Sequence, residues 1–389
     1  MHQDTRRMQA VQSPIIPVVG ELIRNHPGTI SLGQGVVHYG PPPEIEQAIA
    51  QIMADPAMHK YQAVEGLPQL HDVITNKLAE FNGVSLGDDA RLVVTAGGNM
   101  AFMNAMLAIT DPGDEVIIQK PYYFNHEMAI TIADCTPVPV DTDDAYQLDL
   151  AAIESAITSR TRAIVTVSPN NPTGAVYSRD ALCAVNELCA KRGLYHISDE
   201  AYEYFTYDGA VHFSPSTLDA DANHTISLFS LSKAFGFASW RVGYMVIPQR
   251  LFFSVKKIQD TILICPPVVT QAAAVGAMRV GLTYPREMLA GIVKVRRIVL
   301  DALSGLGGLC DIPRADGAFY FLLRLHTDHD PMALVEQLVK DHRVAVIPGT
   351  TFGMERGCYL RVAYGALDED TALEGIERLT GGLHKILGR

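Results

Sequence analysis

The stretch TISLFSLSKAFG, residues 225–236, joins an apolar run to a lysine. The run Thr225–Phe229 has the length and composition of a buried strand, so Lys233 lies just past a predicted strand end. Two other apolar runs end in polar clusters: AIVTVSPNNPTG (163–174) ends in an Asn-Asn-Pro turn, and LYHISDEAY (194–202) ends in two acids. Ligands of open α/β sheets bind at the carboxyl ends of the strands. We therefore expect the three clusters to converge on one pocket.

The residues around Lys233 suit a phosphorylated aldehyde. An amine can form a Schiff base with an aldehyde. The hydroxyls of Ser230 and Ser232 and the guanidinium of Arg241 can hold a phosphate. Each cluster also has an ordinary structural explanation, because most lysines are solvated, Asn-Pro forms turns and an acid after a strand often caps a helix. The chemical interpretation depends on finding all three clusters in order, each at a strand end.

Strand and helix patterns alternate from about residue 90 to about residue 250, which predicts an α/β fold with a mostly parallel sheet. Towards the C-terminus, Gly317–Leu322 and Cys358–Ala363 are predicted strands and Asp330–Lys340 is a predicted helix. The uncharged segment Thr261–Met278 is long enough to raise the question of a membrane span. Because Pro266-Pro267 and a glutamine interrupt it, we interpret it as a buried strand-turn-helix junction.

Five motifs, three of them within the stretches quoted above, occur in a fixed order: Asn-Pro-Thr-Gly (171–174), Asp-Glu-Ala-Tyr (199–202), Ser-x-Ser-Lys (230–233), Arg-Val-Gly-Tyr (241–244) and Leu-Arg-Val-Ala-Tyr (360–364). With them the chain resembles the fold-type I, pyridoxal-phosphate-dependent aminotransferases of class I/II, which include aspartate, aromatic and kynurenine aminotransferases. The resemblance extends from about Ile30 to Tyr364. It implies a large cofactor-binding domain at residues 46–280, with a mostly parallel sheet between helices. A smaller α+β domain would combine residues 1–45 and 281–389.

The resemblance also implies roles for single residues. Lys233 would form the Schiff base with pyridoxal phosphate and later shuttle the proton. Asp199 would pair with the pyridine nitrogen, so that the ring accepts the electrons of the reaction. Tyr202 and Asn171 would hydrogen-bond the ring's phenolic oxygen. Arg361 would grip the substrate α-carboxylate with its planar donors, and Asn171 would also contact the substrate.

The rest of the cofactor site follows from the same resemblance. Gly97, Gly98 and Asn99, at a strand-to-helix turn, resemble a phosphate cup, where backbone N–H groups and the helix dipole favour an anion. Ser230, Ser232 and Arg241 would complete the phosphate contacts. Tyr123 would stack on the cofactor ring. His126 would lie behind Asp199 and orient it, or be an ordinary packed histidine.

Two further positions bear on assembly and substrate. Tyr61 resembles a tyrosine that reaches the phosphate from the neighbouring subunit, which would make the active enzyme a homodimer. Gly35 belongs to a Gly-Gln-Gly run (33–35) similar to that of kynurenine- and methionine-type members, where it contacts substrate. The sequence departs from theirs after Gly35, where Val36, Val37 and Tyr39 could form an apolar rim or pack a domain joint.

Composition narrows the class of protein. The chain has 389 residues, 48% of them hydrophobic and 19% charged, as in globular proteins. A net charge of −12 without a lysine–arginine block argues against a nucleic-acid partner. Six cysteines without Cys-x-x-Cys spacing favour free thiols in a reducing compartment over disulfides or a metal site. No apolar run follows Arg6-Arg7, so we expect neither a secretion signal nor a membrane partner. The expected location is the cytoplasm.

The expected function is therefore transfer of an amino group from an amino acid to a 2-oxo acid. Aspartate-specific members need a second cation for the side-chain carboxylate of the substrate. Some use a lysine beside the glycine cup, where this chain has Asn99. Others use an arginine in the segment that corresponds to residues 261–267, which carries no cation in this chain. Neutral donors, aromatic or large aliphatic, are thus favoured. The alternatives are a β-lyase on the same cofactor and an aspartate-type enzyme. A cofactor-binding regulator is disfavoured, because only about 30 residues precede the matched region.

Overall fold

A central seven-stranded sheet forms the larger lobe of the protein, as seen in a computed structural model that describes residues 4–218 and 223–388. The strand order is β2-β8-β7-β6-β5-β3-β4. The strands from β7 to β4 pair in parallel, while β8 is antiparallel to both of its neighbours. The strands are β2 (Ala90–Thr95), β3 (Glu115–Lys120), β4 (Thr136–Asp141), β5 (Thr161–Val167), β6 (Tyr195–Asp199), β7 (Thr225–Ser230) and β8 (Gly243–Pro248).

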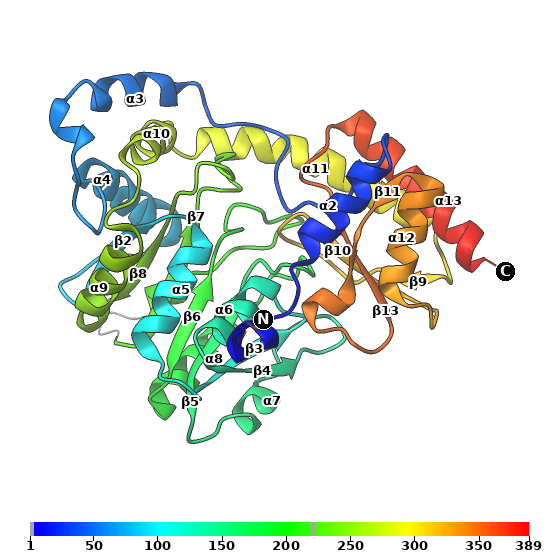
Figure 1. Cartoon of the computed structure of the whole chain (residues 1–389), viewed down its shortest axis with the longest axis horizontal. Helices are drawn as coiled ribbons and strands as arrows, with labels where there is room; N and C mark the ends of the chain where they lie inside the picture. Colours follow the sequence, from blue (N-terminus) through cyan, green and yellow to red (C-terminus); the bar gives the residue numbers. More distant parts are fainter. Residues whose placement is uncertain (1–3, 219–222, 389) are drawn as a thin grey trace.

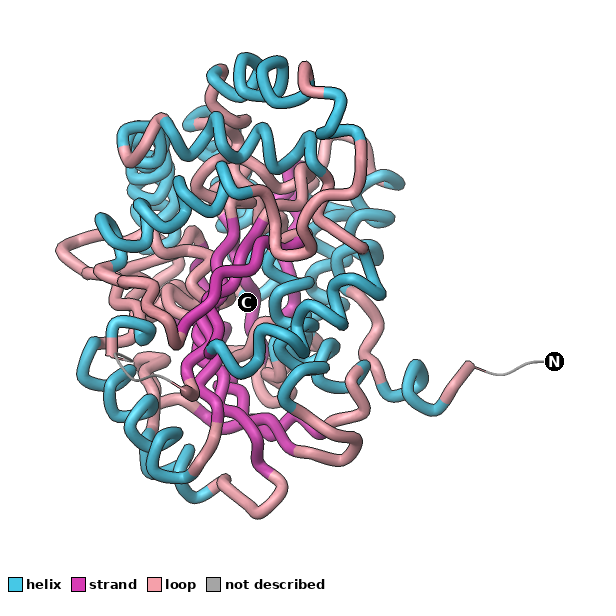
Figure 2. The backbone as a smooth tube through the Cα atoms, turned by 90° about the vertical axis from the view of Figure 1, so that its left-hand side faces the viewer, coloured by secondary structure: helices cyan, strands magenta, loops and turns pink. Residues whose placement is uncertain are grey.

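Helices cover both faces of this sheet (Figure 2). Successive strand residues point to opposite faces. In β5, Ala163 and Val165 pack on the face covered by α5 (Gly98–Ile109) and α6 (Phe124–Ile132), whereas Ile164 packs against α8 (Arg179–Arg192). Because both faces are buried, the strands appear in the sequence as continuous apolar runs. The α/β fold with a mostly parallel sheet, predicted from those runs, is confirmed.

The second lobe contains a four-stranded antiparallel sheet in the order β12-β13-β10-β9. Its strands are β9 (Cys310–Asp311), β10 (Tyr320–Leu325), β12 (Ile347–Pro348) and β13 (Cys358–Ala363). The N-terminal segment joins this lobe, since β1 (Ile30–Ser31) pairs in parallel with β11 (Val344–Ala345) and α2 (Ile15–Asn25) packs on α12 (Pro331–His342) (Figure 1). The division into domains at residues 46 and 280 stays a prediction.

The remaining helices join or flank the lobes. They are α1 (Arg6–Ala10), α3 (Glu44–Met53), α4 (Pro68–Lys77), α7 (Leu150–Ser155), α9 (Phe252–Leu263), α10 (Val268–Arg279), α11 (Thr283–Ser304) and α13 (Glu369–Leu387). Within residues 4–218 and 223–388, no helix is long and apolar enough to cross a membrane.

One predicted element is wrong. Residues 261–263 are not a strand but the last turn of α9, so the segment up to Met278 is a helix-turn-helix junction. Ile264 ends α9 with a φ of 66°, and Pro267 precedes α10. An apolar run this short does not distinguish a strand from the end of a helix. The segment is also less buried than predicted, since Ile262 is 56% exposed in the single chain.

A buried ion pair ties α4 to the segment after β6. The Lys77 ammonium lies 2.5 Å from one carboxylate oxygen of Glu203 and donates to the Tyr244 hydroxyl at 3.0 Å. Both charged side chains are almost inaccessible to solvent, and the amide of Asn82 also donates to Glu203 at 2.8 Å. Because Glu203 directly follows Tyr202, this pair helps to fix the backbone that carries the predicted site residues.

Replacing Lys77 with alanine should therefore destabilise the protein strongly. The Glu203 carboxylate would stay buried without its cation, which costs about 3–5 kcal/mol of the free energy of unfolding. Urea unfolding of the two proteins measures the difference. Lys340→Ala is the matched control, because that lysine pairs with Glu336 at 2.8 Å on an exposed helix surface and such pairs contribute less than about 1 kcal/mol. Equal losses in the two variants would contradict a stabilising role for the buried pair.

Candidate active site

The predicted site residues meet in one cavity of about 500 Å³ between the two sheets. Residues from the ends of β5, β6 and β7 lie beside residues from β10, β13 and the N-terminal segment. The predicted residues that line it are Gly35, Gly98, Asn99, Tyr123, Asn171, Asp199, Tyr202, Ser230, Ser232, Lys233, Arg241 and Arg361. The convergence expected from the three strand ends is therefore present. Gly97 and His126 lie directly behind the lining, whereas Tyr61 does not contribute to it.

Lys233 follows the end of β7 and projects into the cavity, where its amine donates to the carbonyl oxygen of Gly35. Burial, and next the nearby guanidinium groups of Arg361 and Arg241, lower the pKa of Lys233 to about 8, although Asp199 opposes the shift. A substantial share of the amine is then uncharged near neutral pH. Only the uncharged form is a nucleophile or a base, so this environment suits both roles.

Asp199 ends β6 and is held on both carboxylate oxygens. The backbone N–H of Ala201 donates to one oxygen at 3.0 Å, and Nε2 of His126 lies 3.0 Å from the other. The His126 ring also stacks on Phe102, with the ring centroids 4.0 Å apart. The histidine is thus both packed and aimed at the carboxylate, which combines the two interpretations drawn from the sequence. An oriented carboxylate in the cavity suits a partner that carries a proton on nitrogen.

Arg361 comes from β13 and is 2% exposed. Its guanidinium donates to the side-chain oxygen of Asn171 at 2.8 Å and to the Gly33 carbonyl at 2.6 Å. The rings of Tyr320 and Phe352 lie over it, at 4.6 and 5.0 Å from their centroids. Within residues 4–218 and 223–388 no carboxylate pairs with it, and its Nε has no partner. A buried cation with neutral partners is well prepared to bind an anion from outside.

The opposite corner of the cavity suits a phosphate. Gly97 has a φ of 86°, and a Cβ there would lie 2.2 Å from a guanidinium nitrogen of Arg241. Gly98 begins the twelve-residue helix α5, so the N–H groups of its first turn face the same corner. The guanidinium of Arg241 lies 3.4 Å from the Ser232 hydroxyl, and Ser230 lines the same wall. Glycine at position 97 leaves the room that this arginine occupies.

Tyr123 and Asn99 lie on the side of the cavity formed by α5 and α6. The amide of Asn125 donates to the Tyr123 hydroxyl at 2.7 Å, and that hydroxyl is 3.5 Å from the side-chain oxygen of Asn99. The flat Tyr123 ring is therefore fixed at the cavity wall. Tyr61 is 79% exposed on the surface of this chain. Its predicted role in a neighbouring subunit stays a prediction.

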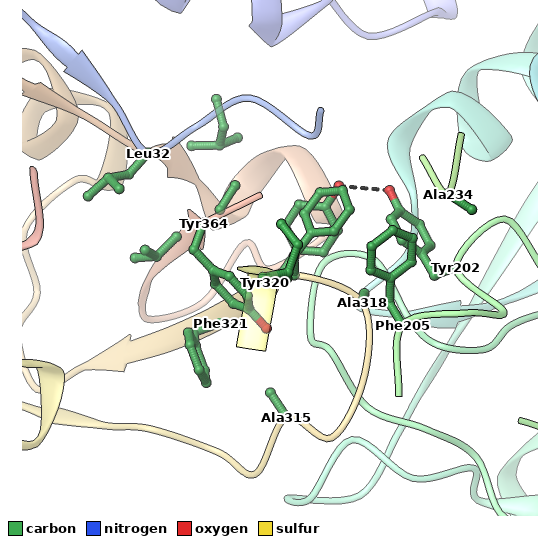
Figure 3. Close-up of a cluster of buried hydrophobic side chains, with 14 of the residues drawn as sticks. Leu32, Tyr202, Phe205, Ala234, Ala315, Ala318, Tyr320, Phe321 and Tyr364 are labelled. Atoms are coloured by element: carbon green, nitrogen blue, oxygen red, sulfur yellow. Dashed lines mark hydrogen bonds between the residues drawn. The ribbon is translucent and has the colours of Figure 1, made fainter. Parts of the chain in front are cut away.

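Sequence reasoning gave no role to several lining residues, among them Tyr320 and Ile16. Tyr320, the first residue of β10, lies beneath Arg361, and its hydroxyl is 2.7 Å from that of Tyr202 (Figure 3). The signal was present, since a tyrosine in an otherwise apolar strand needs a partner for its hydroxyl. Ile16, from α2, had no such signal. Of the predicted apolar rim, Val36 lines the cavity, whereas Val37 and Tyr39 pack against the core.

These features fit pyridoxal phosphate. Gly97 makes room for the Arg241 guanidinium beside the start of α5, Asp199 is oriented for a ring nitrogen, and Lys233 offers an amine with a lowered pKa. Arg361 lines the same cavity, and no carboxylate of the described residues pairs with its guanidinium. The fold and this arrangement define a fold-type I, pyridoxal-phosphate-dependent aminotransferase.

Comparison with known proteins agrees. The family described as aminotransferase class I and II matches residues 27–379, and the chain belongs to it. Aromatic aminotransferase ISS1 of Arabidopsis thaliana is 33% identical in an alignment 394 residues long that covers 98% of this chain and 97% of the relative. A probable aspartate/prephenate aminotransferase of Aquifex aeolicus (strain VF5) is 32% identical, over 92% of this chain and 91% of its own length.

Solved structures are similar over the whole fold. A single mutant of Thermus thermophilus aspartate aminotransferase superposes with a TM-score of 0.89 at 31% identity, covering 98% of this chain and 100% of the other. The aromatic aminotransferase of Pyrococcus horikoshii OT3 gives a TM-score of 0.86 at 30% identity, covering 95% and 99%. The protein is thus an enzyme that transfers amino groups between amino acids and 2-oxo acids with pyridoxal phosphate.

The lowered pKa of Lys233 predicts how the cofactor-free protein captures pyridoxal phosphate. Covalent capture, trapped with borohydride and measured by mass, should rise from about pH 7 to about pH 9, because the uncharged amine is the nucleophile. Arg361→Gln should move this rise to higher pH, since it removes a positive charge that opposes protonation of Lys233. Asp199→Asn should move it to lower pH, since it removes the carboxylate that favours the ammonium. Capture that is independent of pH would show that the lysine is not the titrating group.

Proposed function

We propose that Lys233, Asp199 and Arg361 carry out the transamination and that neutral amino acids are the preferred donors. The observation that supports the catalytic roles is the presence of an amine with a lowered pKa, an oriented carboxylate and a buried guanidinium around one cavity. Each group answers one need of the reaction: a base, a charge that stabilises a protonated ring nitrogen, and an anchor for the α-carboxylate.

Pyridoxal phosphate, when bound, supplies an aldehyde that condenses with amines and a ring that accepts an electron pair. Arg361, whose side chain lines the cavity, would hold the substrate carboxylate with its guanidinium, which would fix the α-carbon inside the cavity. The Lys233 amine would accept the α-proton and return it, since its pKa near 8 allows both steps at neutral pH. Asp199, held by His126 and the Ala201 N–H, would keep a negative charge at the ring nitrogen.

The test of these roles is the variant Lys233→Ala. It should lose turnover almost completely while the protein still binds the cofactor, because the phosphate corner at Ser230, Ser232 and Arg241 remains. Transamination rate and cofactor retention are measured side by side. Lys294→Ala is a suitable control, because that side chain is 67% exposed and does not line the cavity. Activity of Lys233→Ala within about tenfold of the parent would contradict the assignment.

The cavity wall is what favours neutral donors. Ile16 and Val36 contribute apolar surface, and Asn99 is uncharged. Among the described lining residues the only cations are Lys233, Arg241 and Arg361, and each has another role in the proposal. A second carboxylate would have no partner from this chain, and burying it unpaired is costly. The relatives are named for both aromatic and aspartate/prephenate substrates, so their names leave the donor open.

Aromatic or large aliphatic amino acids should therefore be better donors than aspartate. The margin in kcat/KM should be tenfold or more, since a missing charge partner is worth about 1.5–3 kcal/mol. Parallel assays with the same 2-oxo acid acceptor measure it. Aspartate as the best donor would overturn the donor proposal and leave the aminotransferase assignment intact.

We further propose a cytoplasmic homodimer in which each active site receives Tyr61 from the other subunit. The exposed apolar side chains of the larger lobe include Tyr61, Ile262, Ile264 and Val269, which a partner could cover. All six cysteines lie within the described residues and are free thiols, as expected in a reducing compartment. A monomer in sedimentation of the active protein would contradict the shared site.

A further inference from the structure

A direct hydrogen bond between two buried phenols joins the lobes of the protein at the active site. The hydroxyl oxygens of Tyr202 and Tyr320 are 2.7 Å apart (Figure 3). Tyr202 follows β6 of the large sheet, whereas Tyr320 begins β10 of the small sheet. Tyr202 is 5% exposed and Tyr320 is fully buried, so water does not compete for this bond. The link is therefore a fixed part of the cavity wall.

Tyr320 also contacts the carboxylate anchor. Its ring lies 4.6 Å from the central guanidinium carbon of Arg361, and Arg361 donates to the side-chain oxygen of Asn171. The amide nitrogen of Asn171 in turn lies 3.4 Å from the Tyr202 hydroxyl. Tyr320, Arg361, Asn171 and Tyr202 thus form a closed ring of contacts. A Cβ at Gly35 would lie 2.5 Å from the Tyr320 hydroxyl, so the backbone there also limits where this hydroxyl can lie.

The direction of the hydrogen bond determines what Tyr202 can do. Burial raises the pKa of both phenols, so each keeps its proton at neutral pH. The described residues offer the Tyr320 proton no acceptor other than Tyr202. Both tyrosines line the cavity, but Tyr202 alone is partly exposed there, and its hydroxyl oxygen also faces the Asn171 amide donor, so its own proton can point into the cavity. The arrangement that uses both protons has Tyr320 donate to Tyr202, and Tyr202 donate into the cavity.

We propose that Tyr320 is a positioning residue that aims the Tyr202 proton at the ring oxygen of bound pyridoxal phosphate. A hydroxyl that accepts a hydrogen bond becomes a stronger donor, because hydrogen bonds in a chain polarise one another. Tyr202 would then stabilise a negative charge on the ring oxygen more strongly than it would alone. The inference rests on the proposed role of Tyr202 at that oxygen.

Tyr320→Phe tests the proposal, since it keeps the ring beneath Arg361 and removes only the hydroxyl. The absorbance of the bound cofactor is titrated against pH. Without the Tyr320 hydroxyl the negative ring oxygen is less stabilised, so the apparent pKa of the bound cofactor should rise by about half a unit or more. In the same variant kcat should fall several-fold while KM for the donor changes less than about twofold, because Arg361 keeps its contacts.

Two further variants make the result specific. Tyr207→Phe is the matched control, because Tyr207 is a buried phenol that donates to the Ala318 carbonyl at 2.5 Å and does not line the cavity. Its titration should equal that of the parent. In Tyr202→Phe, adding Tyr320→Phe should cause no further shift, because the proposed effect passes through Tyr202.

A Tyr320→Phe titration equal to that of the parent would overturn the proposal. So would a shift of equal size in the Tyr202→Phe background, which would mean that Tyr320 acts by packing alone. The urea midpoints of Tyr320→Phe and Tyr207→Phe show whether either substitution destabilises the fold. If the apparent pKa of the bound cofactor shifts only in proportion to the loss of stability in the two variants, that result also counts against the proposal. Failure of the parent to bind pyridoxal phosphate would instead refute the proposed function.

Discussion

The burial of Arg361 between the two lobes is the constraint on which the rest of the site depends. The residue is 2% exposed, and its guanidinium donates hydrogen bonds only to neutral oxygens, those of the Asn171 side chain and the Gly33 carbonyl. The aromatic ring of Tyr320 lies beneath it. Burying a charge is costly unless it is hydrogen-bonded or paired. The protein holds the cation with two neutral acceptors, and no carboxylate of the described residues pairs with it. The arrangement is stable in the free protein and remains ready for a carboxylate.

This cation also acts on the rest of the cavity. After burial itself, Arg361 and Arg241 are the causes that lower the pKa of Lys233, so the proposed substrate anchor also makes the amine easier to deprotonate. Through Asn171 and Tyr320 it contacts both neighbours of the Tyr202 hydroxyl. The small lobe contributes Arg361 and Tyr320, and the large lobe contributes Lys233 and Tyr202. The chemistry is therefore possible only where the two sheets meet.

Much of this was predictable from the sequence because buried parallel strands leave clear apolar runs, and polar residues at their ends converge on one edge. Lys233, Asp199 and Asn171 follow from that logic. Arg361 and the glycine cup needed the family resemblance, since an arginine in a strand or a glycine pair in a turn is common. The last turn of α9 was misread because a three-residue apolar run carries no period. Tyr320 was missed because it lies in an apolar strand pattern and the partner of its hydroxyl, Tyr202, is distant in sequence. The role of Tyr61 stays a prediction, because it concerns a contact with a second chain.

The most direct test of the account is the affinity of the cofactor-loaded protein for a simple carboxylate that lacks an amino group, such as 3-phenylpropionate, measured by calorimetry. Arg361→Gln should weaken binding by about ten- to a hundredfold, as expected for the loss of a charged hydrogen-bonded pair. Arg324→Gln, an exposed arginine on the neighbouring strand β10, should bind as the parent does. An unchanged affinity in Arg361→Gln would show that the buried guanidinium does not bind the substrate carboxylate and would contradict the account.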